Sequence, residues 1–166
     1  MHLVFSSLAT SLTFISTIAC WYVEMLIFSA IQDTSHSSIT NYNFKIMFFL
    51  FQTGTLSSVI AKLTSLQGLG LHKNSLSGSI PDSIGSLSSL RVLYLDQNLL
   101  TGRIPISIPS NLVDLRLRSN KLNGMIPEEV QNAKYLQVLY LDDNNITGTV
   151  PTELHGLVQL QRGFRL

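Results

Sequence analysis

The chain has 166 residues, which is enough for one domain with a sizeable core. Its formal net charge of +1 gives no electrostatic reason to expect a nucleic-acid partner. The single cysteine, Cys20, excludes an intramolecular disulfide and leaves no cysteine cluster for zinc.

Residues 1–53 form an apolar segment without glycine or proline, and only three of its residues are charged. Within it, residues 3–23 carry no charge over 21 positions, which is long enough to cross a bilayer. The stretch is a poor signal peptide, because no Lys or Arg precedes it and no clear cleavage site follows. We interpret it either as a membrane segment or as an apolar segment that associates with other surfaces or lacks fixed structure.

The sharp change of composition near residue 53 has a second interpretation. The residues F-F-L-F-Q at 48–52 are what a T-rich tract ending in CAG would encode, as at the end of an intron. On this interpretation residues 1–53 are translated noncoding sequence, and the chain is a fragment of a longer protein.

Residues 54–161 repeat with spacings of 24, 22 and 24 residues between equivalent asparagines. Each copy follows L-x-x-L-x-L-x-x-N-x-L-x-G-x-[IV]-P, and the third is two residues shorter, so we expect Pro109 to tighten its outer segment. The copies end in N-S-L-S-G-S-I-P at 74–81, N-L-L-T-G-R-I-P at 98–105, N-K-L-N-G-M-I-P at 120–127 and N-N-I-T-G-T-V-P at 144–151. This period is typical of repeats that stack into a solenoid around one continuous core.

Each position of the repeat has a structural role. The L-x-L alternation predicts short parallel strands at 68–72, 92–96, 114–118 and 138–142. The repeated Asn should form a ladder of hydrogen bonds to the backbone at the strand ends, through Asn74, Asn98, Asn120 and Asn144. The inward residues should be buried: Leu69, Leu71, Leu93, Leu95, Leu115, Leu117, Leu139 and Leu141 in the strands, and Ile80, Ile104, Ile126 and Val150 beneath the outer segments.

The repeat pattern weakens at both ends. A spacing of 24 residues places Lys45 and Met47 where the preceding coil should carry strand leucines, and Gly163 and Arg165 where the following coil should. We therefore predict that the repeats stop near residue 53 and that residues 162–166 form a divergent tail. Because the end coils lack polar caps, we also expect the isolated chain to be marginally soluble.

The G-x-[IV]-P ending of all four copies resembles the plant-type leucine-rich repeat of receptor-like kinases, receptor-like proteins and polygalacturonase-inhibiting proteins. The resemblance implies an α/β repeat fold: a short right-handed solenoid with a concave parallel β-sheet, here preceded by the apolar non-repeat segment. It also implies binding of proteins or peptides outside the cell.

Outward strand residues should line up in columns across the concave sheet. One column contains Gly70, Tyr94, Arg116 and Tyr140, and the next contains His72, Asp96, Arg118 and Asp142. Arginine alternates with Tyr in the first column and with Asp in the second, so we expect cation–π contacts and ion pairs. Tyr and Arg are enriched at protein-binding hot spots, and Gly70 should leave room for a ligand backbone. Alternatively, these side chains only tie the coils together.

No residue pattern predicts catalysis, a cofactor or a metal site. The four histidines lack ligand spacing, and the adjacent acidic pairs have no partner for acid–base roles. The sequon Asn145-Ile146-Thr147 predicts a glycan on Asn145 if the chain enters the secretory pathway.

The favoured hypothesis is a recognition module of a plant receptor-like protein or receptor-like kinase, at the cell surface or outside the cell, acting in signalling. Its partner would be a protein or peptide ligand or a co-receptor, and residues 3–23 would provide membrane association. The alternatives are a truncated receptor without independent activity and an enzyme-inhibitor type leucine-rich repeat protein.

Overall fold

The computed structural model of the chain describes residues 45–47, 53–160 and 163–166. The apolar stretch predicted at 3–23 lies outside these residues. Among the helices that the structure describes, none is both long and apolar enough to span a bilayer.

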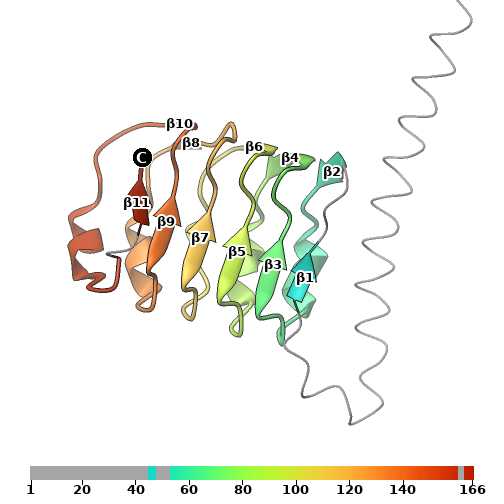
Figure 1. Ribbon diagram of the computed structural model, residues 1–166, viewed down its shortest axis with the longest axis horizontal. Coiled ribbons are helices and arrows are strands. Elements are labelled where there is room, and N and C mark those ends of the chain that lie inside the picture. The colour runs from blue at the N-terminus through green and yellow to red at the C-terminus, as the bar shows by residue number, and fades with distance from the viewer. Residues whose placement is uncertain (1–44, 48–52, 161–162) are drawn as a thin grey trace, which may run out of the picture.

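The repeats form a solenoid whose one side is a six-stranded parallel sheet in the order β1-β3-β5-β7-β9-β11 (Figure 1). Adjacent strands belong to successive coils, so each leucine pairs in register with its equivalent, as Leu69 with Leu93. The strands are β1 (Lys45–Met47), β3 (Gly68–Gly70), β5 (Val92–Tyr94), β7 (Asp114–Arg116), β9 (Val138–Tyr140) and β11 (Gly163–Arg165).

The four central strands begin at the predicted residues and end two residues earlier than predicted. Backbone hydrogen bonds between coils continue beyond them, since Leu71 N donates to Tyr94 O at 2.8 Å and Lys73 N to Asp96 O at 2.9 Å. Regular pairing stops because the chain turns at a residue in the left-handed region, which is Lys73 in one coil and Gln97 in the next, both with φ of +56°.

The leucines of the L-x-L pairs are buried in one core cluster, as predicted. Ile80, Ile104 and Ile126 are also buried, with exposed fractions of 2–6%. The prediction for Val150 is wrong, because 41% of this residue is exposed. Val150 lies in the last outer segment that the structure describes, so no further coil covers it.

A second set of short strands follows the asparagines. They form a three-stranded parallel sheet in the order β2-β4-β6 and a separate pair, β10-β8. The glycine that follows each has a positive φ, for example +74° at Gly78 and +79° at Gly102, which explains the repeated glycine. The strands are β2 (Thr53–Thr55), β4 (Ser75–Ser79), β6 (Leu99–Thr101), β8 (Asn123–Gly124) and β10 (Asn145–Ile146).

Short 3-10 helices lie on the outer side: η3 (Ser58–Lys62), η4 (Asp82–Ser86), η5 (Glu128–Asn132) and η6 (Thr152–Gly156). Pro81, Pro127 and Pro151 precede three of them with extended ψ angles of 136–141°. The shortened third copy has no helix between Pro105 and Pro109. Its compact segment packs closely on the preceding coil, so that an added Cβ at Gly85 would meet the backbone carbon of Ser107 at 2.9 Å.

The sheet extends beyond the predicted repeat ends. Strand β1 pairs Ile46 with Leu69, and β11 pairs Phe164 with Leu139, which are offsets of 23 and 25 residues rather than 24. A shift of one residue changes which side chains point inward. The fixed spacing therefore selected Lys45, Met47, Gly163 and Arg165 wrongly as the residues aligned with strand leucines.

Candidate functional site

The tyrosine–arginine column runs along the concave sheet in strand register: Gly70, Tyr94, Arg116, Tyr140 and Arg165. The guanidinium carbon of Arg116 lies 4.3 Å from the Tyr94 ring centroid and 5.4 Å from that of Tyr140. Arg165 continues the alternation, at 5.0 Å from the Tyr140 ring. These distances are in the range of cation–π attraction.

Asp114, the first residue of β7, holds the centre of this column. Its carboxylate accepts hydrogen bonds from Arg116 Nε at 3.0 Å and from Arg116 Nη2 at 2.9 Å. It also accepts a hydrogen bond from the Tyr94 hydroxyl at 2.9 Å. Asp114 is only 9% exposed, so these bonds are partly shielded from water.

These contacts change the titration of both partners of Asp114. Burial of the ring, together with the hydrogen bond to Asp114, raises the pKa of Tyr94 above its ordinary value. The hydrogen bonds to Asp114 raise the pKa of Arg116. Both groups therefore keep their protons, and their hydrogen bonds, throughout the physiological pH range.

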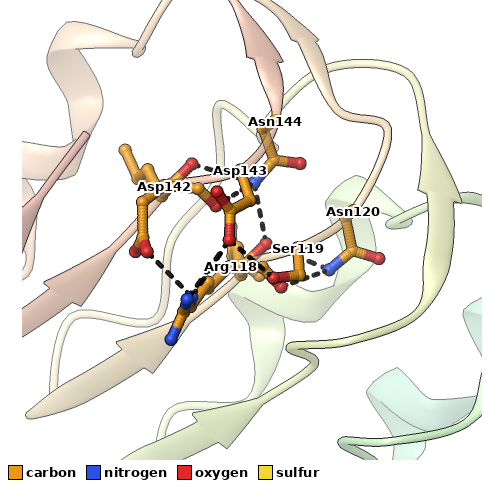
Figure 2. A network of polar contacts seen from close by, with 8 residues as sticks. Arg118, Ser119, Asn120, Asp142, Asp143 and Asn144 are labelled. Atoms are coloured by element: carbon orange, nitrogen blue, oxygen red, sulfur yellow. Dashed lines mark hydrogen bonds and ion pairs between the residues drawn. The ribbon is translucent and has the colours of Figure 1, made fainter.

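The second column centres on Arg118, whose contacts Figure 2 shows. Arg118 Nε lies 2.8 Å from Asp142 Oδ2, and Nη2 lies 3.3 Å from Asp143 Oδ2. Ser119 also donates its hydroxyl hydrogen to Asp143, at 3.1 Å. The sequence predicted Asp96 and Asp142 as neighbours of Arg118; the second carboxylate is instead Asp143, which lies in the left-handed turn of the following coil.

The Gly70 end of the surface differs from the prediction. Gly70 is buried, because β1 adds a strand beside β3 and pairs Met47 with it. The predicted open space for a ligand backbone is therefore absent at this position. His72 packs edge-on against Tyr94, with ring centroids 6.2 Å apart.

The asparagines anchor the strand ends beneath both columns. Asn120 Nδ2 donates to the carbonyls of Leu95 and Leu117, both at 3.0 Å, and to Arg118 O at 3.2 Å. Its Oδ1 accepts from Leu100 N at 3.0 Å. Asn98 and Asn144 repeat these contacts, and Asn74 makes the two bonds within its own coil.

Three residues of this surface were missed from the sequence: Asp114, Asp143 and Arg165. Asp114 lies outside both columns and reaches Tyr94 and Arg116 diagonally, two positions along the strand. The signal that could have found it is the sequence D-L-R at 114–116, with an acid and a base on the same face of one strand. The sequon residue Asn145 lies in β10 and is exposed.

Comparison with family models gives matches to leucine-rich repeats at residues 65–87, 89–110 and 110–162. No curated protein matches the chain. Solved structures do match, and all those named below come from Arabidopsis thaliana.

The ectodomain of the membrane receptor kinase GASSHO1/SCHENGEN3, solved in complex with CASPARIAN STRIP INTEGRITY FACTOR 2, is 37% identical, with a TM-score of 0.64. The match covers 69% of this chain and 14% of that one. The receptor kinase HAESA, solved with the peptide hormone IDA and the co-receptor SERK1, is 34% identical over 68% of this chain and 20% of that chain, with a TM-score of 0.66.

A chain of the BIR3–SERK2 complex is 30% identical, with a TM-score of 0.61. This match covers 81% of the present chain and 80% of that chain. The chain thus spans most of this shorter relative, but only a small part of the receptor kinase ectodomains.

Proposed function

Because this chain belongs to the leucine-rich repeat family and is similar to plant receptor ectodomains, we propose that it binds a peptide or protein through its concave face. The partner would be a peptide ligand or a co-receptor, since the similar structures are titled as complexes of both kinds. We propose recognition and not catalysis as the activity.

The observation that carries this proposal is the tyrosine–arginine column. Tyr94 and Tyr140 are part-exposed and lie on either side of Arg116, so flat aromatic and guanidinium surfaces face outward in fixed positions. Side chains of these types supply contact area at a small cost in conformational entropy. The asparagine bonds and the leucine core hold the strands that carry them.

The proposed setting is the plant cell surface, within a receptor-like protein or receptor-like kinase that acts in signalling. The extracellular character of the similar ectodomains supports this setting. Membrane association through residues 3–23 and a glycan on Asn145 belong to the same proposal, and exposure of Asn145 is compatible with modification.

The test is a selection of plant secreted peptides, displayed as a library on yeast, against the purified chain. We expect the wild type to enrich specific peptides and the double variant Tyr94→Ala/Tyr140→Ala to lose at least about tenfold in affinity for them, as hot-spot truncations do. Tyr135→Ala is the matched control, because Tyr135 is 55% exposed and outside the column.

Circular dichroism should show the same fold for all three proteins. Equal enrichment by the wild type and the double variant would contradict binding through the column. Absence of any enriched peptide would favour the alternative of a receptor remnant without independent activity.

A further inference from the structure

Asp114 has a local environment unlike that of the other acidic groups on the concave face. Among the described residues it is the only charged one in the buried class, with 9% exposure. Its strand neighbours in register are Val92 and Val138. Asp142 and Asp143, in contrast, keep 18% and 61% of their side-chain surface exposed.

The contacts of Asp114 restrict the orientation of Arg116. Two parallel hydrogen bonds from Nε and Nη2 fix the plane of the guanidinium, which a single bond would not do. The third bond, from the Tyr94 hydroxyl, fixes the ring against which that plane lies. The Tyr94–Arg116–Tyr140 surface is therefore ordered before a partner arrives, which reduces the entropy cost of binding.

The same contacts remove the net charge of this surface. The positive charge of Arg116 is balanced by Asp114 at 2.9 Å, and that of Arg118 by two carboxylates at 2.8 and 3.3 Å. An acidic ligand would have to displace a carboxylate already in bidentate contact, or approach the excess negative charge beside Arg118. A neutral aromatic or apolar segment can pack on the planar groups without this penalty.

We infer that Asp114 determines the specificity of the concave face by fixing and neutralising Arg116, so that the centre of this face accepts neutral aromatic or apolar peptide segments and rejects acidic ones. The inference rests on the proposed binding function and applies to the surface around Arg116. Arg165 lies beyond Tyr140, on the edge strand β11.

The experiment compares the wild type with Asp114→Asn, which keeps the size of the side chain and removes its charge. Arginine Nε–H signals are followed by ¹⁵N NMR during titration with sodium phosphate as the anionic probe. In the wild type, phosphate should cause no saturable shift at Arg116. In Asp114→Asn, saturable phosphate binding should appear there, and Nε–H exchange should become about tenfold faster, as expected for loss of a charged hydrogen-bond partner.

Asp142→Asn is the matched control, because it removes a carboxylate from Arg118 in the neighbouring column. It should change the Arg118 signal and leave Arg116 unaffected. The pKa of Tyr94, measured from its ring signals, should fall in Asp114→Asn, since the hydrogen bond to the carboxylate raises it in the wild type.

Saturable phosphate binding at Arg116 in the wild type would overturn the inference, and this titration is informative even if Asp114→Asn does not fold. An unchanged Arg116 signal in folded Asp114→Asn would overturn it as well. In the peptide selection, Asp114→Asn should enrich more acidic peptides than the wild type does. The NMR measurements need no partner, so they separate a failure of this inference from a failure of the proposed function.

Discussion

The ladder asparagines show how one side chain can connect two coils. Asn120 bonds to carbonyls of its own coil and to Leu95 O of the preceding one, and it accepts Leu100 N from that coil as well. All its polar groups are satisfied although the residue is only 8% exposed. An amide is required because it carries both a donor group and an acceptor.

Replacing Asn120 by Ala should lower the free energy of unfolding by about 2–3 kcal/mol, because buried backbone groups would lose their partners. Chemical denaturation measures this difference. Asn123→Ala provides the control, since Asn123 is exposed in β8, and it should change stability by less than about 0.5 kcal/mol. Equal effects of the two substitutions would contradict a structural role for the ladder.

At the residue scale, the sequence predicted what repeats and missed what occurs once. The asparagines and leucines were identified because each appears in every copy at a fixed position. Asp114 was not identified, because Val and Gly occupy the aligned positions of the neighbouring strands and its contacts run diagonally. The left-handed residues Lys73, Gln97, Ser119 and Asp143 share no residue type, so their conformation follows from the turn and not from their own preference.

At the scale of elements, the third coil shows how a deletion is accommodated. It lacks a 3-10 helix, and its outer segment lies close enough to η4 that Ser107 occupies the space beside Gly85. The sequence predicted the shorter segment from the missing two residues. It could not predict the contact, because Gly85 and Ser107 are non-equivalent positions of two different coils.

We expect Gly85→Ala to lower the free energy of unfolding by about 1–3 kcal/mol, the usual range for overpacking, because the added methyl group would meet backbone. The control is Gly156→Ala in η6, where an added Cβ has no atom within 4 Å. That change should be neutral or slightly stabilising, since alanine loses less backbone entropy on folding. A destabilisation by Gly156→Ala as large as that by Gly85→Ala would show that helix geometry, and not the contact, is responsible.

At the scale of the whole molecule, solenoid architecture leaves the last coil partly uncovered. Within the chain, each coil is covered by the next, so Ile80 and Ile126 are 5% and 6% exposed. At the C-terminal end, Val150 is 41% and Val158 is 74% exposed, beside an open cavity of about 490 Å³ that Leu154, Leu157 and Phe164 also line. The strand β11 partly covers this end, which the divergent sequence of residues 162–166 did not predict.

This end should make the isolated chain self-associate, because an exposed apolar surface next to an unpaired edge strand favours contact between copies. Val158→Lys places a charge in that surface and should shift association, measured by sedimentation velocity over a series of concentrations, to higher protein concentration. Ile106→Lys is the matched control, since Ile106 is 61% exposed on the outer side, away from the last coil. If both substitutions change association equally, general surface charge explains the effect; if the wild type remains monomeric at all concentrations, the uncovered coil does not drive association.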